Sequence, residues 1–230
     1  MNVFLLSHVW IKDNQKYKRD LVDRVVAHYK YNYPDIKIIL TGHGVRLHDS
    51  TLENLDHFIW HDKIISTEVG RGHPQCVSEG IAIAKKIGAT HIFKNRADMI
   101  VCCKEIFKRC FDKMAIEDKK GIGLFQRELL HDITIFSETE IMRQAWDTSK
   151  WDASTRVDGV INSNNALIAH GHDIKSSFYQ AHQKDLPVAF LDPWWEKYFK
   201  TMSDKQFLNF DFDWTKHTFF SKYSRRAQSL

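Results

Sequence analysis

The amino-acid sequence predicts an α/β fold in which a mostly parallel central sheet is flanked by helices. Strand and helix patterns alternate through the first half of the 230-residue chain, as is typical of parallel strands joined by helices. Residues 3–6 and 36–40 are continuous apolar runs and are predicted to be strands. Between them, apolar residues recur at the spacing of one helical face: Leu21, Val22, Val25, Val26 and Tyr29.

The next segments continue this alternation. Pro34 ends the first helix, and the second strand leads into Thr41-Gly42-His43-Gly44, which is predicted to be a turn because glycine adopts backbone geometries that other residues resist. One or two short strands are expected within residues 57–65. Pro74 lies where the first turn of another helix belongs, and Gly88 is its predicted stop.

The second half is less regular. Its predicted elements are a strand at 91–94, a helix at 106–114 and strands at 122–126 and 133–136. Ser137 to Glu140 form a capping-box sequence, which predicts a helix starting there. Residues 149–165 are polar and are predicted to be a long loop, a kind of segment that often carries function beside a rigid sheet. The sequence contains no internal repeat, and we predict a single domain spanning residues 1–230.

Composition excludes several classes of protein. The content of 43% hydrophobic and 27% charged residues is that of a globular protein and not of a disordered or collagen-like chain. The four cysteines form no CxxC pair, which argues against a zinc ribbon or a secreted disulfide scaffold and favours a reducing, cytoplasmic compartment. No basic residue precedes the apolar N-terminal run, so a first strand is expected there instead of a signal peptide.

The charge and hydropathy of the chain bear on its partners. No apolar stretch approaches the roughly 18–20 residues that cross a bilayer, so no membrane span is expected. The formal net charge of +4 would suit an anionic ligand such as a nucleotide. The sequence lacks a helix-turn-helix, an RNP-type aromatic motif and a zinc finger, so no nucleic-acid partner is expected.

The most informative segment runs from Gly70 to Asp98 and reads as a loop, a helix and a strand that ends in charged residues. Ligands of parallel α/β sheets bind at the carboxyl ends of the strands, so Lys94, Arg96 and Asp98 are expected to face the site. Lysine and arginine can bind a diphosphate, and a carboxylate can hold a magnesium or manganese ion. The alternative is a solvated strand end with a surface ion pair worth at most about 1 kcal/mol.

This segment and the order of elements resemble the GT-A class of nucleotide-sugar-dependent glycosyltransferases, in which a strand ends at an Asp-x-Asp metal motif. More narrowly, Phe93-Lys-Asn-Arg-Ala-Asp-Met99 is similar to the Lys-x-Arg-x-Asp signature of the WavE-type lipopolysaccharide-synthesis glycosyltransferases. Ile135-Phe-Ser137 followed by Ala145-Trp146 is similar to a later stretch of those proteins. The resemblance covers residues 1–150. Arg96 stands at the first aspartate position of the motif, where it would supply part of the charge of a metal ion.

The resemblance implies a GT-A-like, Rossmann-like fold and a transferase that moves a sugar from a nucleoside diphosphate sugar, UDP-type, to a glycan or lipid-linked saccharide. It implies Mn²⁺ or Mg²⁺ as cofactor, a nucleotide-binding half at residues 1–100 and an acceptor-binding half at 101–230. The expected donor-binding residues are Ser7, His8, Thr41, Gly42, Arg71, Gln75, Lys94, Arg96 and Asp98. The first four lie in two loops expected after the early strands, Ser7-His8-Val9-Trp10 and Thr41-Gly42-His43-Gly44. Arg71 and Gln75, with Ser78, are expected at the start of the helix before Asp98. Ordinary turn chemistry and helix capping are the alternatives for those outside the charged strand end.

Two further roles follow from the chemistry. An inverting transferase needs a carboxylate to accept the proton of the acceptor hydroxyl. Asp132, Asp152 and Asp158 are candidates, and we select Asp158, although loop aspartates also serve as turn and cap residues. GT-A enzymes commonly take a metal ligand from a C-terminal histidine, so His172 of His170-Gly-His172 is expected to join Asp98; a solvated His-x-His pair is the alternative.

The C-terminal third is rich in aromatic residues. We predict an aromatic extension that packs back on the core, since each ring can bury on the order of 150–250 Å². Two alternatives remain: Trp194 and Trp195 form a platform for sugar rings, or the aromatic and basic residues rest on an anionic membrane surface at the cytoplasmic face. The rival function is a catalytically weak GT-A-like protein that binds nucleotide or glycan without turnover.

Overall fold

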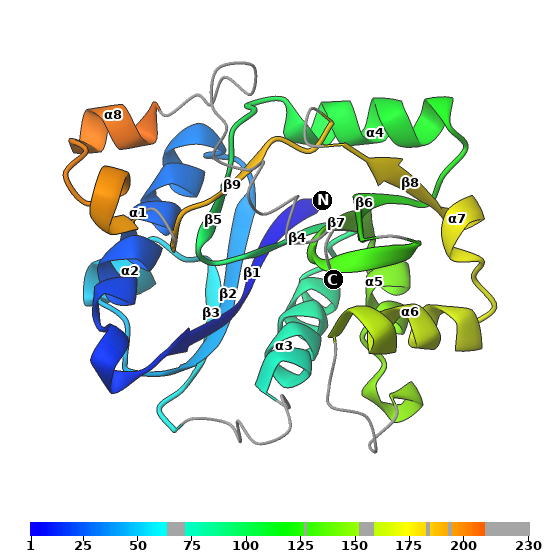
Figure 1. The fold of residues 1–230 in the computed structure, drawn as a ribbon, viewed down its shortest axis with the longest axis horizontal. Helices are drawn as coiled ribbons and strands as arrows, with labels where there is room; N and C mark the ends of the chain where they lie inside the picture. The colour runs from blue at the N-terminus through cyan, green and yellow to red at the C-terminus, as the bar shows by residue number, and fades with distance from the viewer. Residues whose placement is uncertain (64–71, 127, 152–158, 183–184, 193–194, 210–230) are drawn as a thin grey trace.

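The computed structural model describes residues 1–63, 72–126, 128–151, 159–182, 185–192 and 195–209. They form a seven-stranded sheet in the order β3-β2-β1-β4-β7-β6-β8 and a two-stranded sheet of β5 and β9 (Figure 1). Strands β1 to β4, β6 and β8 run in one direction in the large sheet, and β7 runs in the opposite direction. The predicted α/β fold with a mostly parallel sheet is therefore confirmed.

The strands are β1 (Asn2–Ile11), β2 (Lys37–Gly44), β3 (His57–His61), β4 (His91–Arg96), β5 (Met99–Val101), β6 (Gly121–Gln126), β7 (Leu129–Glu138), β8 (Phe178–Ala181) and β9 (Val188–Phe190). The helices are α1 (Tyr17–Asn32), α2 (Asp49–Glu53), α3 (Gly72–Lys86), α4 (Ile106–Ile116), α5 (Thr139–Ala145), α6 (Gly159–Ala169), α7 (Ile174–Ser177) and α8 (Asp204–Leu208). Short helical turns are η1 (Asp13–Gln15), η2 (Thr148–Lys150) and η4 (Trp195–Phe199).

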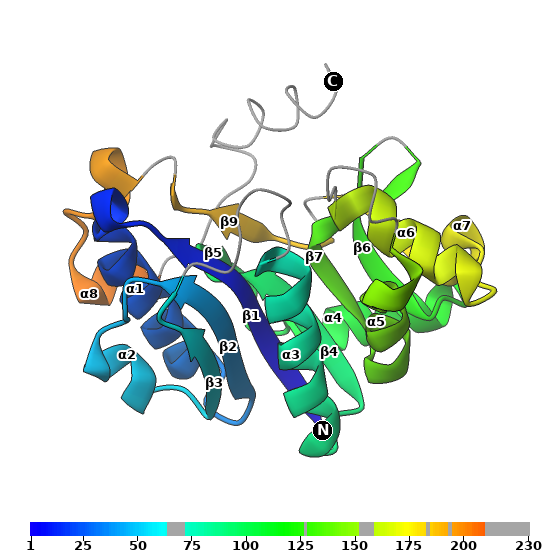
Figure 2. The same ribbon diagram turned by 90° about the horizontal axis from the view of Figure 1, so that it is seen from below.

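Helices cover both faces of the large sheet because the side chains of each strand alternate between two apolar clusters. Phe4, Leu6 and Phe93 face the cluster that contains residues of α1, α4 and α8. Leu5 and Ile92 face the other cluster, which contains residues of α3, α5 and α6. Figure 2 shows α3 beside β1, with α5 and α6 further along the sheet.

Strands β1 and β2 extend further than predicted. The segments Ser7 to Trp10 and Thr41 to Gly44 are parts of these strands and not loops. One extra residue in β1 between Leu6 and Val9 shifts the register, so the two strands stay paired as far as Ile11 and Gly44. The apolar pattern did not predict this continuation, because polar residues follow the apolar run of each strand.

Gly44 allows this close pairing. Its φ is +104°, and a Cβ there would overlap the carbonyl oxygen of Ile11. We expect Gly44→Ala to lower the free energy of unfolding by about 1–3 kcal/mol more than Gly88→Ala. Gly88 is the matched control because it also has a positive φ, +76°, but no atom lies within 4 Å of its added Cβ. Urea unfolding of both variants measures the difference, and equal losses would contradict a role for the Ile11 contact.

The polar stretch at 149–165 was predicted to be a loop, but its last part is a helix. Helix α6 begins at Gly159, and its Asn164 is buried. The Asn164 side chain accepts a hydrogen bond from the Leu130 N–H at 3.0 Å and donates one to the Leu130 carbonyl at 2.8 Å. The asparagines that suggested a loop therefore attach this helix to β7. The predicted capping box at α5 is also absent: the N-cap is Glu138, whose side chain makes no capping bond.

The described part of the aromatic C-terminal segment belongs to the core. Trp195, Phe199 and Phe207 are 5% exposed or less and join the cluster that contains α1. Trp195 therefore offers no open platform for a sugar ring, while Trp194 and residues 210–230 lie outside the described part of the chain. Among the described helices, none is long and apolar enough to cross a membrane.

Candidate functional site

A cleft of about 240 Å³ lies at the carboxyl ends of β1 and β4, against η1 and the first turns of α1. Its lining residues are Trp10, Lys12, Gln15, Lys18, Leu21, Val22, Arg96 and Asp98. Lysine and arginine side chains therefore meet an aromatic ring at the edge where ligands of parallel α/β sheets bind. Two predicted residues, Arg96 and Asp98, are brought together here.

Arg96 and Asp98 form a two-pronged ion pair. The Arg96 Nε donates to Asp98 Oδ1 at 3.0 Å, and Nη2 donates to Oδ2 at 2.6 Å. The guanidinium also lies 4.8 Å from the ring centre of Phe190. Burial alone would lower the pKa of Arg96, but the Asp98 carboxylate raises it, so the guanidinium stays charged.

The two-stranded sheet holds these groups in place. Met99 of β5 pairs with Phe190 of β9, one residue after Asp98 in the chain. The backbone N–H of Leu191 donates to the Asp98 carbonyl at 2.9 Å. The short sheet therefore fixes both the carboxylate that pairs with Arg96 and the ring that covers it.

A second carboxylate, Asp192, follows directly after β9. Its side chain accepts a hydrogen bond from the Tyr17 hydroxyl at 2.9 Å and lies 3.2 Å from the Lys18 ammonium. Burial, together with the hydrogen bond to Asp192, raises the pKa of Tyr17 to about 12, so the phenol remains a donor at neutral pH. Asp192 thus ties the first turn of α1 to the end of β9.

Trp10 forms the aromatic wall of the cleft. Its ring stacks on His43 with centroids 6.0 Å apart and planes at 19°. The ammonium of Lys12 lies 4.0 Å from the centre of the Trp10 ring, a cation–π distance. Lys12 forms no ion pair with any described carboxylate, so its charge is available to an anionic ligand.

A buried polar cluster lies on the α3 side of the same strand end. Lys94 has no exposed surface, and its ammonium donates to the backbone carbonyl of Asp132 on β7. The Asp132 carboxylate lies 3.5 Å from His73 Nδ1 and 3.1 Å from His131 Nδ1. Gly159 packs so closely that a Cβ there would overlap Asp132 Oδ2.

Burial and the attraction between opposite charges set the protonation states of the side chains in this cluster. Burial would raise the pKa of Asp132, but His131, His73 and Lys94 together hold it well below its usual range. Burial lowers the pKa of Lys94 to about 8, against the attraction of Asp132. Burial also lowers the pKa of His73 to about 3, so His73 is neutral at pH 7. The cluster therefore holds one ammonium and one carboxylate close together.

Several predicted donor-binding residues do not line the cleft. Ser7 and Thr41 are fully buried, and Thr41 packs 3.2 Å from the position of a Cβ on Gly80 of α3. Gly42 lies within β2, paired with Val9 and Trp60. His8 lies in β1, but its side chain is outside the described part. Alternation along the strands therefore directs the Ser7 and Thr41 side chains toward α3.

The residues predicted at the start of α3 are also directed elsewhere. Gln75 is exposed and donates to Glu79 at 2.9 Å. Ser78 donates to the Trp146 carbonyl at 3.0 Å, toward α5. Lys94 was expected to face the site at the strand end, but its side chain is buried. Arg71 and Asp158 lie outside the described residues.

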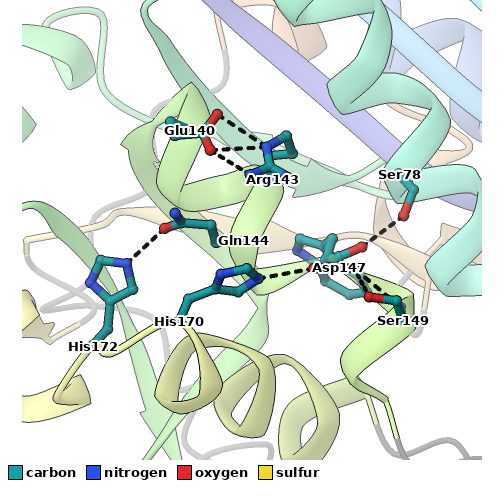
Figure 3. A network of polar contacts seen from close by, with 9 residues as sticks. Ser78, Glu140, Arg143, Gln144, Asp147, Ser149, His170 and His172 are labelled. Atoms are coloured by element: carbon teal, nitrogen blue, oxygen red, sulfur yellow. Dashed lines mark hydrogen bonds and ion pairs between the residues drawn. The ribbon is translucent and has the colours of Figure 1, made fainter.

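His172 is not brought to Asp98. Figure 3 shows it bonded to Gln144 of α5 at 2.7 Å, while His170 contacts Asp147 at 2.9 Å. Burial and the charge of Lys120 lower the pKa of His172. Lys120 precedes β6 at the edge where the parallel strands begin, whereas Asp98 follows the end of β4. The two predicted metal ligands therefore lie at opposite edges of the sheet.

The described residues also fit a divalent metal poorly at the cleft. Both oxygens of Asp98 are engaged by Arg96, so a metal ion would have to displace the guanidinium. No group of three His, Cys, Asp or Glu side chains within the described ranges could hold a metal ion. Mn²⁺ and Mg²⁺ prefer open carboxylate oxygens, which this pair does not offer.

Sequence reasoning missed Lys12, Lys18 and Asp192 at the cleft and His73 beside Asp132. Trp10 was within a segment singled out as a ligand-binding loop, and Asp132 was a candidate base. No local pattern marks the others, because their meeting depends on contacts such as that between α1 and the end of β9.

No family model matches the chain, so the WavE-type resemblance stays a prediction. No curated protein matches it either. Solved structures do. A 4-diphosphocytidyl-2C-methyl-D-erythritol synthase is 11% identical with a TM-score of 0.49, over 80% of this chain and 91% of that one. A mannosyltransferase from Pyrobaculum calidifontis, in complex with GDP-Man and Mn²⁺, is 8% identical with a TM-score of 0.49, over 78% and 54%.

A nucleoside-diphosphate-sugar pyrophosphorylase from Vibrio cholerae RC9 is 13% identical with a TM-score of 0.48, over 82% of this chain and 95% of that one. These proteins share the general α/β arrangement with this chain. The identities are too low to carry over a substrate, a metal ion or a catalytic residue.

Proposed function

We propose that the protein is a glycosyltransferase that moves a sugar from a nucleoside diphosphate sugar, of the UDP type, to a glycan or a lipid-linked saccharide. The observation that carries the proposal is the cleft at the carboxyl ends of β1 and β4, which Lys12, Lys18 and Arg96 line together with the Trp10 ring. Residues 1–100 would supply most of the nucleotide-binding half and residues 101–230 the acceptor-binding half. The pathway would be polysaccharide or lipopolysaccharide assembly at the cytoplasmic face of a membrane.

The chemistry of sugar transfer fits this arrangement. When the bond between the anomeric carbon and the diphosphate breaks, negative charge develops on the leaving diphosphate. Fixed cations at that position stabilise the departing group, and their effect is largest where water is excluded. The Trp10 ring adds an apolar wall beside these cations.

Asp158 remains our proposal for the general base. Of the three candidates, Asp132 is the one within the described part of the chain, but its pKa lies well below the usual range. A general base works best when its pKa is close to the working pH, so Asp132 is a poor proton acceptor. Its fixed charge instead belongs to the buried cluster with His73, His131 and Lys94.

The test is release of UDP from a panel of UDP-sugars, with and without simple saccharide acceptors. We expect Asp158→Asn to lower the turnover number by about 100-fold or more, because loss of a general base removes a factor of that order. Binding of UDP should not change. Asp152→Asn is the matched control and should retain most activity. A full loss in Asp152→Asn with an active Asp158→Asn would reassign the base.

A catalytically weak binding protein is the second candidate. The closed pair of Arg96 and Asp98 favours it, since the Asp-x-Asp motif is incomplete and its remaining aspartate is engaged. UDP binding without release of UDP from any donor would support this second function. Absence of binding by UDP, GDP and CDP would overturn both.

A further inference from the structure

We propose that the cleft binds the diphosphate of its ligand through Lys12, Lys18 and Arg96, with no divalent metal ion between protein and phosphate. The inference rests on the proposed function, since it concerns how a nucleoside diphosphate is held in the same cleft. It assigns the neutralising charge to three side chains of this chain, of which only Arg96 lies in the charged strand end.

The first argument is the state of the two carboxylates. A metal-binding aspartate must present free oxygens to the ion. Asp98 instead uses both oxygens on Arg96, at 3.0 and 2.6 Å, and Asp192 accepts from Tyr17 and pairs with Lys18. Both carboxylates therefore act as counter-ions that hold the cations in place.

The second argument is that neighbouring side chains orient the Arg96 guanidinium for binding an anion. Its Nε and Nη2 contact Asp98, and its guanidinium lies 4.8 Å from the Phe190 ring centre. These contacts fix the plane of the group, while no described residue accepts a hydrogen bond from Nη1. A guanidinium held on one side and open on the other suits two-pronged binding of phosphate oxygens.

The third argument is the placement of the lysines. Lys12 is held 4.0 Å from the Trp10 ring centre and has no carboxylate partner among the described residues. Lys18 lies 3.2 Å from Asp192, with its side chain 17% exposed. Both line the cleft together with Arg96. The three cations exceed the two carboxylates, Asp98 and Asp192, by one positive charge, which attracts a diphosphate and disfavours a metal ion.

The experiment is calorimetric titration of the full-length protein with UDP, once in EDTA and once with Mn²⁺. We expect the same affinity in both, falling as salt is added because the contacts are between charges. Arg96→Ala and Lys18→Ala should each weaken UDP binding by roughly 10- to 100-fold in EDTA, as expected for loss of a charged hydrogen bond. Inorganic pyrophosphate should show the same ranking of variants.

The matched controls replace an arginine and a lysine that lie outside the cleft. Arg143→Ala breaks the exposed pair with Glu140, and Lys108→Ala breaks the exposed pair with Asp112. Neither should change UDP binding. Asp98→Asn should weaken it by about fivefold or less, since a partly exposed ion pair contributes about 0–1 kcal/mol. Circular dichroism confirms that each variant is folded.

The outcomes separate the two proposals. UDP binding that requires Mn²⁺ and disappears in Asp98→Asn would overturn the metal-free site and leave the transferase proposal standing. Binding in EDTA that is indifferent to both Arg96→Ala and Lys18→Ala would overturn the assignment of these side chains. No binding of UDP, GDP or CDP in either condition would overturn the proposed function, and this inference with it.

Discussion

Replacing Lys94 with methionine is expected to lower the free energy of unfolding by about 1–3 kcal/mol, because buried Asp132 loses the ammonium that donates to its carbonyl and offsets its charge. Lys94 has no exposed surface, and its ammonium donates to the carbonyl of Asp132. Methionine has a similar length and fills the same space, so the packing changes little. The loss comes from the Asp132 carboxylate, which would remain buried without the ammonium. Urea unfolding at pH 7 measures the difference.

Two controls define this effect. Lys85→Met removes a lysine whose side chain is 64% exposed and lies 3.8 Å from Glu140, so it should cost no more than about 1 kcal/mol. The double variant Lys94→Met with Asp132→Asn should lose less than the sum of the single losses, because the unpaired charge is gone. A loss below about 1 kcal/mol in Lys94→Met would mean that the buried ammonium contributes no net stability.

Lys94 also shows where prediction from sequence ends. The sequence correctly predicts a strand at 91–94, and β4 ends beside the cleft. Whether a lysine on that strand faces solvent or the interior depends on what covers it. Its partner, Asp132, lies 38 residues later in the chain and reaches it only because β7 pairs with β4 in antiparallel register.

The same limit explains why only some residues of the cleft could be predicted from the sequence. Arg96 and Asp98 are two residues apart, so their proximity follows from local sequence, and the structure brings them together as expected. Lys18 and Asp192 are joined only when α1 packs beside the end of β9. Periodicity predicts α1 as a helix but does not say which strand end its first turn meets.

Ser7 and Thr41 were predicted to bind ligand, but both side chains are buried. Glycine and polar residues at 7–10 and 41–44 suggested turns that bind ligand, because apolar patterning stops there. The structure continues both strands through these positions and buries the two hydroxyl side chains, that of Thr41 against α3. A pattern of apolar residues marks the centre of a strand well and its end poorly, since a small polar residue can also be buried beneath a helix.

Acid is expected to destabilise the protein through His73. Its pKa is about 3 in the folded protein and 6.5 when exposed, so between these values the unfolded chain binds a proton that the folded chain excludes. Stability contributed by neutral His73 is therefore complete above pH 6.5 and is lost as the pH falls toward 3. The free energy of unfolding should drop by about 2 kcal/mol at pH 5 and about 3 kcal/mol at pH 4 from this residue.

The variant His73→Gln isolates this contribution, because glutamine keeps a donor for Asp132 and does not titrate. Urea unfolding between pH 7 and pH 4 should show a flatter curve for the variant, so that its deficit relative to the wild type shrinks as the pH falls. His48→Gln, at a surface pair with Asp20, is the control for the substitution of histidine by glutamine itself. Burial beside the Trp146 ring, 4.9 Å away, and the positive charges of Lys94 and Arg96 oppose protonation of His73, while Asp132 favours it. Parallel curves for wild type and His73→Gln would show that the acid sensitivity arises elsewhere in the chain.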